Sequence, residues 1–457
     1  MTTDWCERAI GQVGTAIETG LVSVREVVDS VLDRIATRDP SLHAYTTVFD
    51  EIARREADEA DRLIANGGYL GPLHGIPLSI KDLIDVAGVP TTCASRASQS
   101  AAAIADASAV ARLKAAGAII IGKNNLHEFA FGTTGEDSSF GPTFHPLDQA
   151  RSPGGSSSGS AVSVAAGMAL GSIGTDTGGS VRIPAAACGL VGLKPSFGEI
   201  SCDGVVPLAP SLDHVGPLTR CVADARLLYE TMVDRSSATI RERPPLRLIL
   251  GCPKPFFLKR LDDDIRSTFE QALARLRSNG WTIHDTTVRH ARYSPVICLH
   301  LVLAEAAVTH MRGLTERAEQ YTEGVRLRLE LGRYVMGEDY ARAQHGRQVL
   351  GLAIDHALDT CDALVLPTLA IPAPRLATTV VDLSGEPEPL RNAMLRLTQL
   401  FNATGHPAVS LPCGLTTAGL PCGLQLIGRR NQTDHLLDVA AKVEVGLIEE
   451  KLSAGNQ

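Results

Sequence analysis

Glycine and serine crowd together twice between residues 151 and 195, on either side of a short apolar segment. The stretch reads RSPGGSSSGSAVSVAAGMALGSIGTDTGGSVRIPAAACGLVGLKP. Glycine lets a backbone turn tightly and approach a ligand closely, which bulkier residues resist. Serine supplies a nucleophilic hydroxyl or carries a proton. The pattern predicts an active site whose backbone N–H groups and hydroxyls face a reacting carbonyl group.

A flexible Gly/Ser linker is the alternative explanation of this composition. Residues 161–173 are apolar, however, and the charged residues Arg182 and Lys194 stand at defined places beyond them. Prolines also stiffen both ends of the stretch. A linker needs none of these features, so the active-site interpretation is favoured.

Four separated segments resemble motifs of the amidase signature family of serine hydrolases, in the family's order and over most of the chain. GGSSSGSA and GTDTGGSVRIP match its central pattern, GIPLSIKDLIDVAG matches its upstream motif, and FNATGHPAVSLPCG with GLPCGLQLIGR matches its C-terminal motifs; these are residues 154–161, 174–184, 75–88 and 401–429. Two positions depart from the common pattern. Ser158 stands where many relatives have glycine, and His145 stands where many have the asparagine of an Asn-Pro pair.

The resemblance implies a role for individual residues. Ser180 would be the nucleophile, Ser156 the bridging serine and Lys81 the base. The oxyanion hole would be built from the backbone N–H groups of Thr177, Gly178, Gly179 and Ser180. The substrate-binding and supporting residues would be Ser157, Thr175, Asp176, Arg182, Phe129, Phe131 and Gly132. Relatives also carry a cis peptide bond before the bridging serine, here between Gly155 and Ser156.

Elementary chemistry explains why such a trio works. A serine hydroxyl is a weak nucleophile until a base takes its proton, and a lysine does so only when it is neutral. Free lysine has a pKa of ~10.4, so the site must lower it by burial or neighbouring charges. Lys81 follows the apolar run IPLSI, which suits a lysine at the end of a buried strand. The alternative is a surface lysine whose stem covers apolar surface.

Another serine motif overlaps the same segment. GSSSG, residues 155–159, also satisfies the G-x-S-x-G nucleophile elbow of α/β-hydrolases, with Ser157 at its centre. That motif follows a strand, whereas LDQARSPGG is polar and contains a proline. Its acid and histidine would have to come from unmarked places such as Asp213 and His406.

Metal and cofactor chemistry have little support in the sequence. The thirteen histidines form no H-x-x-x-H pattern and the ten cysteines form no C-x-x-C pair. We expect no metal and no cofactor. His127 and Glu128 are interpreted as ordinary polar residues at a helix start.

The fold expected from the resemblance is one α/β domain over residues 1–457, with a large, mixed, mostly parallel central sheet covered by helices on both faces. Its catalytic core would span about 60–230, and a variable region at about 240–340 would shape the substrate entrance. With 44% hydrophobic residues, 457 residues can bury a large core.

Local patterns place some of the elements. Ser23 and Glu26 form a capping box before a helix that ends near Pro40. Helical segments at 108–116, 261–280 and 356–360 precede the strand-like AIIIG, WTIHDTTV and DALVLP. Residues 372–391 are expected to form a long loop near the site.

Charge and composition limit the partners. A net charge of −8 disfavours nonspecific binding of nucleic acid. No apolar run approaches the ~20 residues of a membrane-spanning helix, and no secretory signal is visible. We expect a cytoplasmic protein, since its ten cysteines form no disulfide framework. The expected partner is a small-molecule amide or carbamate, without nucleic acid or membrane, and the resemblance allows a homodimer.

The main functional expectation is a stand-alone amidase that cleaves the C–N bond of linear amides through an acyl-enzyme on Ser180. The same attack would serve carbamates, including urethanes, and activated esters. The alternative within the family is the A subunit of a tRNA-dependent amidotransferase, which releases ammonia from glutamine with the same triad and works with partner subunits. A non-catalytic binding protein is disfavoured, because all three proton-transfer residues are present.

Overall fold

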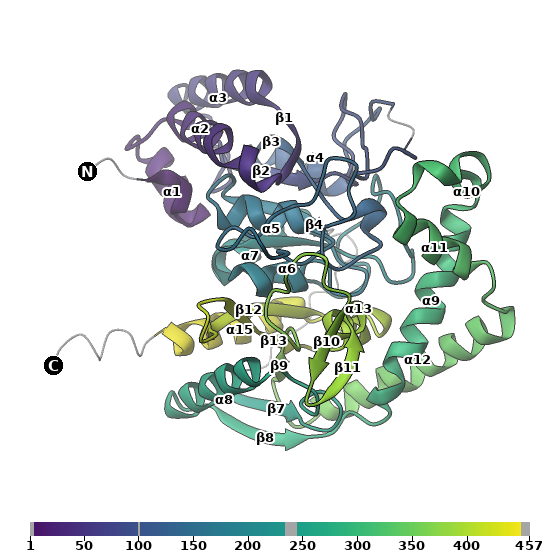
Figure 1. The fold of residues 1–457 in the computed structure, drawn as a ribbon. Coiled ribbons are helices and arrows are strands. Elements are labelled where there is room, and N and C mark those ends of the chain that lie inside the picture. Colours follow the sequence, from purple (N-terminus) through teal and green to yellow (C-terminus); the bar gives the residue numbers. More distant parts are fainter. Residues whose placement is uncertain (1–3, 99–100, 234–244, 449–457) are drawn as a thin grey trace.

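The computed structural model describes residues 4–98, 101–233 and 245–448 of the chain. Residues 240–244 of the expected entrance region therefore lie outside the described residues. Two sheets are seen within the described ranges, a large central one and a small hairpin. Figure 1 shows the central sheet in the body of the molecule, with helices around it.

The central sheet has eleven strands in the order β1-β3-β2-β4-β6-β5-β12-β13-β9-β7-β8. The strands are β1 (Tyr45–Val48), β2 (Pro77–Lys81), β3 (Ile119–Asn124), β4 (Gly171–Thr175), β5 (Val191–Lys194), β6 (Val215–Thr219), β7 (Ile249–Pro253), β8 (Thr282–Thr286), β9 (Ala363–Pro367), β12 (Ala408–Leu415) and β13 (Pro421–Ile427). The hairpin consists of β10 (Val380–Leu383) and β11 (Glu386–Pro389). These last two strands lie in the segment expected to be a loop, and that expectation is wrong.

The α/β class and the mixed sheet are confirmed, but the sheet is not mostly parallel. The parallel pairs are β2–β3, β2–β4, β7–β8 and β7–β9. The other neighbouring pairs in the sheet are antiparallel. Strands that are joined by short turns must run antiparallel. Strands β12 and β13 are joined in this way, by a turn that contains Gly419 at a φ of 77°.

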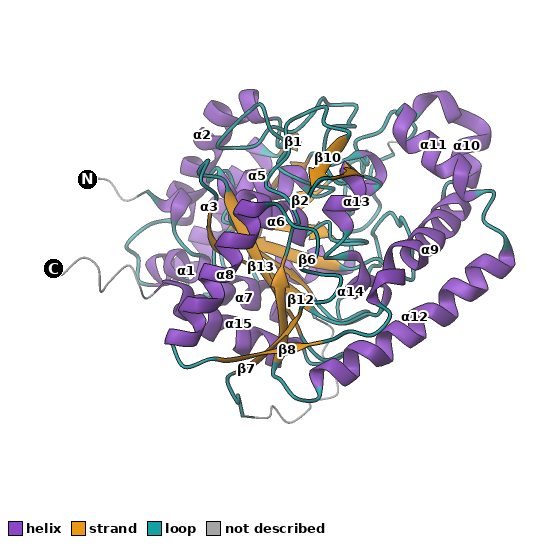
Figure 2. Ribbon diagram, turned by 60° about the horizontal axis from the view of Figure 1, so that its bottom comes forward, coloured by secondary structure: helices purple, strands orange, loops and turns teal. Residues whose placement is uncertain are grey.

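Helices form layers on the sheet (Figure 2). They are α1 (Ile10–Glu18), α2 (Val24–Leu42), α3 (Asp50–Ala65), α4 (Ser108–Ala115), α5 (Ser158–Ala165), α6 (Arg182–Cys188), α7 (Val222–Met232), α8 (Asp263–Ser278), α9 (Ser294–Thr309), α10 (Met311–Arg317), α11 (Glu323–Gly332), α12 (Gly337–Leu358), α13 (Leu390–Leu395), α14 (Gln399–Ala403) and α15 (Thr433–Ile448). Short 3-10 helices span Trp5–Glu7, Glu128–Ala130, Ala291–Tyr293 and Ala318–Gln320. Helices α5 and α6 pack on each other and on the sheet, while α15 packs on α7, α8 and the strands β12 and β13.

The expected capping box is confirmed at the start of α2. The Ser23 side chain accepts a hydrogen bond from the Glu26 backbone, and the Glu26 carboxylate accepts one from the Ser23 N–H. The apolar face of α2 is buried. The helix continues two residues past Pro40, which lies in its last turn. The expected helix–strand pairs are also confirmed as α4–β3 and α8–β8, and the end of α12 precedes β9.

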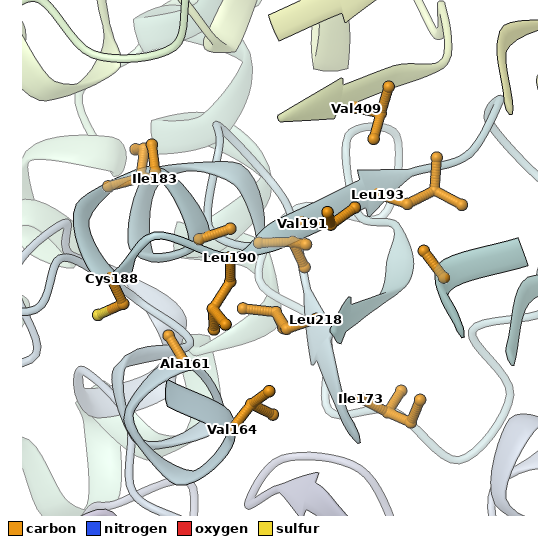
Figure 3. Packing of buried hydrophobic residues seen from close by; sticks show 14 of the residues in the cluster. Ala161, Val164, Ile173, Ile183, Cys188, Leu190, Val191, Leu193, Leu218 and Val409 are labelled. Carbon is orange, nitrogen blue, oxygen red and sulfur yellow. The ribbon is translucent and has the colours of Figure 1, made fainter. Parts of the chain in front are cut away.

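A continuous apolar core holds the glycine-rich and serine-rich segments in place (Figure 3). Ala161 and Val164 of α5 lie near Leu190 and Leu218, and Ile183 of α6 lies on the other side of Leu190. All of these side chains are buried. Helix α5 therefore anchors the serines that precede it, and α6 anchors the loop that precedes it.

Helices α9 to α12 form a group at the edge of the molecule, drawn in green in Figure 1. Among the residues that the structure describes, one helical stretch, Ala291–Thr309, has the length and apolar composition to cross a membrane. This stretch is not an uninterrupted apolar run, because it contains Arg292, His300 and Glu305. Helix α9 packs against α11, α12 and α14.

Replacing Ser23 by alanine is expected to lower the free energy of unfolding by ~1 kcal/mol, because α2 loses the hydroxyl that caps its third N–H group. Urea unfolding followed by circular dichroism measures the change. Ser41→Ala in the last turn of α2 is the matched control, because Ser41 is exposed and its hydroxyl donates to the Arg38 carbonyl within the same helix. Equal effects of the two substitutions would contradict the capping role.

Candidate active site

Lys81 is the last residue of β2 and its side chain is fully buried. Its Nζ donates to Ser156 Oγ at 2.8 Å and to Thr175 Oγ1 at 2.8 Å. Burial lowers the pKa of Lys81 to about 7, although the carboxylates of Asp176 and Asp213 act in the opposite direction. An amine with this pKa is partly neutral at neutral pH, so it can accept a proton. The surface-lysine alternative is excluded.

Ser156 lies between Lys81 and the glycine loop. The peptide bond between Gly155 and Ser156 is cis, and the Ser156 carbonyl accepts a hydrogen bond from the His127 N–H at 3.1 Å. Its hydroxyl is fully buried beside the amine of Lys81. Since a hydroxyl both donates and accepts, Ser156 can pass a proton to the amine and take one from another group.

Ser180 ends the loop that joins β4 to α6, and its side chain lines a pocket. No side chain in the described part of the chain is hydrogen-bonded to its hydroxyl. The backbone N–H groups of residues 177–180 likewise donate no hydrogen bond to any described residue. The loop thus presents an unengaged hydroxyl that can attack a carbonyl carbon. Beside it are unengaged N–H donors that can bind the carbonyl oxygen.

Gly179 has a backbone conformation that favours glycine. Its φ is 136°, and an added Cβ would overlap Thr398 Oγ1 and lie 2.7 Å from Thr398 Cβ. The neighbouring Gly178 carbonyl accepts a hydrogen bond from Thr398 Oγ1 at 2.6 Å. The loop is therefore held by Thr398 on one side and has no room for a larger residue at Gly179.

A buried ion pair fixes both ends of this loop. Arg182 Nη2 lies 2.9 Å from Asp176 Oδ1, and both side chains are fully buried. The same guanidinium donates to Thr398 O, Asn402 Oδ1 and Gln425 Oε1. Burial alone would raise the pKa of Asp176, but the charge of Arg182 overrides this and holds it well below its usual value.

Asp213 also supports the loop, a role that the sequence reasoning missed. Its carboxylate accepts a hydrogen bond from Thr177 Oγ1 at 2.5 Å and two more from the N–H groups of Leu208 and Ala209. Burial raises the pKa of Asp213 to about 6. No motif marked Asp213 as a partner of Thr177, because 36 residues separate them.

The pocket beside Ser180 has a volume of ≈ 290 Å³. It is lined by Ala130, Phe131, Gly132, Thr133, Thr177, Gly178, Ser180, Leu208, Leu212, Pro295, Val296, Cys298, Leu299, Val302, Arg391, Asn392, Leu395 and Gln399. The expected lining residues Phe131 and Gly132 are among them, whereas Phe129 is not. Phe129 has a φ of 48° and packs its ring against His310 and Tyr321 instead. The lining residues from α9 and α13 carried no sequence motif and were not named in advance, although α9 lies in the region at about 240–340 that was expected to shape the entrance.

The remaining expected supporting residues lie around Lys81. Ser157 Oγ donates to the Thr175 carbonyl at 3.1 Å, and Thr175 accepts from Lys81. Ser157 is therefore buried away from the pocket. His406 contacts Thr404 and Asp355, and neither it nor Asp213 reaches Ser157. These contacts exclude the nucleophile-elbow alternative.

The polar residues near the loop at 127–128 have structural partners. His127 lies 3.3 Å from Asp137 Oδ2, and Glu128 accepts hydrogen bonds from Ser95 and Thr322. No group of three or more potential metal ligands is found among the described residues. Neither the His127 side chain nor the Glu128 side chain lines the pocket.

The two departures from the common motif are accommodated by hydrogen bonds. Ser158 Oγ donates to Thr143 Oγ1 at 3.2 Å. His145 Nε2 lies 2.9 Å from the Ala187 carbonyl at the end of α6, and its Nδ1 accepts from the Leu147 N–H. Both residues are buried and neither lines the pocket.

The chain is similar to known proteins over most of its length. The family model described as Amidase matches residues 26–437. A curated relative from Symbiobacterium thermophilum, named as the A subunit of glutamyl-tRNA(Gln) amidotransferase, is 38% identical over 92% of this chain and 93% of its own length. A crystal structure described as an amidase superposes with a TM-score of 0.91 and 36% identity, covering 96% of this chain and 99% of the other. The structure of the A subunit of glutamyl-tRNA(Gln) amidotransferase from Thermotoga maritima superposes with a TM-score of 0.80 and 30% identity, covering 97% and 96%.

Replacing Arg182 by methionine is expected to lower the free energy of unfolding by ~3–5 kcal/mol, because Asp176 is left as a buried carboxylate without its cation. Urea unfolding measures the loss. Arg342→Met is the matched control, since Arg342 forms exposed ion pairs with Glu338 and Asp339 and should cost less than ~1 kcal/mol. An Arg182 variant as stable as this control would refute the anchoring role of the pair.

Proposed function

This chain belongs to the amidase family, and from that premise we propose that it is the amide-hydrolysing subunit of a glutamyl-tRNA(Gln) amidotransferase. The observation that carries the proposal is near full-length similarity to relatives named as the A subunit of that enzyme. The first five of these relatives are 35–38% identical and are matched over 93–96% of their own length. The similarity therefore extends well beyond the catalytic motifs, into the segments that connect them.

The expectation of a stand-alone amidase for small amides or carbamates is corrected by these relatives. The curated names at 35–38% identity refer to one component of a larger enzyme, and the Thermotoga maritima structure has the same name. A small molecule is therefore not the sole expected partner. The sequence reasoning failed because the motifs encode amide cleavage, which both kinds of enzyme perform, and no motif marks an interface with companion chains.

In the proposed reaction, Ser180 attacks the carboxamide carbon of glutamine while its proton moves to Ser156. Ser156 passes its own proton to Lys81, which must be neutral to receive it. The 2.8 Å contact between Lys81 Nζ and Ser156 Oγ supports this path. The unengaged N–H groups of residues 177–180 would bind the oxyanion.

Collapse of the tetrahedral intermediate breaks the C–N bond. The proton returns through Ser156 to the leaving nitrogen, so ammonia departs and the glutamyl group remains as an ester on Ser180. Water then attacks the ester, with the same relay taking its proton, and glutamate is released. In the complex, the ammonia would be used by a companion chain to amidate the glutamyl-tRNA.

The setting that we propose for this complex is the cytoplasm. The ten cysteines are free, as expected in a reducing compartment. We also propose that the described chain works as one domain, since strands from both halves share the central sheet.

The glutaminase rate is expected to rise with pH through about 7 and to level off above it, since burial lowers the pKa of Lys81 to this value and only the neutral amine accepts a proton. The measurement is kcat/KM against pH. Lys81→Met should lower kcat/KM by ~10²–10⁴-fold. Lys254→Met is the control, because Lys254 is exposed and pairs with Asp285. A rate that stays constant from about pH 5.5 to 8.5 would refute the role of Lys81 as base.

Assembly tests the proposed function directly. The chain is mixed with the companion subunits and glutamyl-tRNA(Gln), and formation of glutaminyl-tRNA is measured with glutamine or with ammonium chloride as nitrogen donor. We expect Ser180→Ala to abolish the glutamine-dependent reaction and to leave the ammonium-dependent reaction intact. A chain that does not associate with the companions, or a variant that still uses glutamine, would overturn the proposal.

A further inference from the structure

Arg391 lies in the wall of the pocket that also contains Ser180. It is the second residue of α13 and follows the β10–β11 hairpin. Its Nε is buried without a hydrogen-bond partner. Among the described residues, no carboxylate forms an ion pair with it. Arg391 is half-buried, and leaving its buried Nε–H without an acceptor costs free energy, so a charged group of this kind in a pocket wall points to an anionic group supplied by a ligand.

The neighbouring Arg328 shows the contrast. Arg328 and Arg391 both pack on the ring of Phe131, with guanidinium carbons 5.4 Å and 5.8 Å from its centroid. Arg328 has an acid within reach, Asp137 at 3.8 Å, and it is absent from the pocket lining. Burial and the charge of Arg328 lower the pKa of Arg391 to about 10, which still leaves it charged at neutral pH. Arg391 is thus the cation that faces the pocket.

The rest of the pocket wall lacks acidic groups. The lining contributed by Leu208, Leu212 and Leu395 is apolar, as is that of Val296, Leu299 and Val302. Among the described lining residues there is no aspartate and no glutamate. This wall can cover a hydrocarbon chain, but it offers no carboxylate to balance the charge of a substrate ammonium group.

We propose that Arg391 binds a carboxylate of the amide substrate and thereby selects amides that carry one, with the amide carbonyl at Ser180 and the intervening carbon chain against the apolar wall. The inference rests on the proposed function in one respect, because both require that Ser180 cleaves an amide. It does not depend on which molecule receives the released ammonia. It also predicts that the α-ammonium group of glutamine contributes little to binding.

Three amides of the same chain length separate these contributions. Glutaramate has the carboxylate without the α-amino group, pentanamide has neither, and glutamine has both. Ammonia release by the chain, alone and with its companion subunits, gives kcat and KM for each. We expect kcat/KM for glutaramate to exceed that for pentanamide by ~10- to 100-fold, the usual size of a hydrogen bond to a charged group. The value for glutamine should lie within about 10-fold of that for glutaramate.

Substitutions of Arg391 test whether this residue causes the preference for a carboxylate. Arg391→Gln should raise KM for glutaramate by ~10- to 100-fold, and it should lower kcat/KM for glutaramate far more than kcat/KM for pentanamide. Arg391→Lys should retain part of the preference, because it keeps the charge. Arg333→Gln is the matched control, since Arg333 is exposed and lies outside the pocket.

The outcomes distinguish this inference from the proposed function. Equal kcat/KM for glutaramate and pentanamide in the unaltered chain would overturn the inference, and this comparison does not depend on whether a variant folds. An equal loss with both substrates in Arg391→Gln would also overturn it. A glutamine value more than about 10-fold above that of glutaramate would refute the prediction about the ammonium group. A carboxylate preference in a chain that never supports glutaminyl-tRNA synthesis would leave the inference standing and refute the proposed function.

Discussion

The buried ion pair between Asp176 and Arg182 fixes the geometry on which the candidate site depends. The two residues bracket the loop of residues 177–180, so their contact sets the distance between its ends. Arg182 also ties the loop to the C-terminal part of the sheet through Asn402 and Gln425. Because every donor of this guanidinium is directed at an acceptor, the charge is tolerated in the core. The N–H groups of residues 177–180 donate no hydrogen bond to any described residue, so they remain available to a ligand.

Exclusion of water from the same buried region lowers the pKa of Lys81. Removing a cation from water disfavours its charged form, and this effect on Lys81 outweighs the two nearby carboxylates. Asp176 responds oppositely because its counter-ion is in direct contact. The same environment thus holds a partly neutral amine and a charged carboxylate close to each other. The pKa values of the two groups respond differently because Asp176 has a partner of opposite charge at hydrogen-bond distance and Lys81 has none among the described residues.

The sequence correctly predicted those parts of the structure that depend on short-range patterns. The capping box of Ser23 predicted the start of α2, and the apolar run before Lys81 predicted a buried strand end, because both depend on neighbouring residues. The direction of the strands was predicted less well, since it depends on how distant segments return to the sheet. The roles of Asp213, Thr398 and Arg391 were missed for the same reason: each role depends on contacts across tens to hundreds of residues. The catalytic roles themselves remain predictions, although the motif residues converge as the resemblance implied.

The anchors of Arg182 have a consequence for how the protein is made. Its partner Gln425 lies 243 residues further along the chain. At a synthesis rate of about 5–20 residues per second, this segment takes roughly 10–50 s to emerge from the ribosome. During this interval the nascent chain already contains Lys81 and Ser180, yet the loop of residues 177–180 lacks its C-terminal anchors. The loop of residues 177–180 can therefore reach its final geometry only after the chain has been synthesised beyond Asn402 and Gln425.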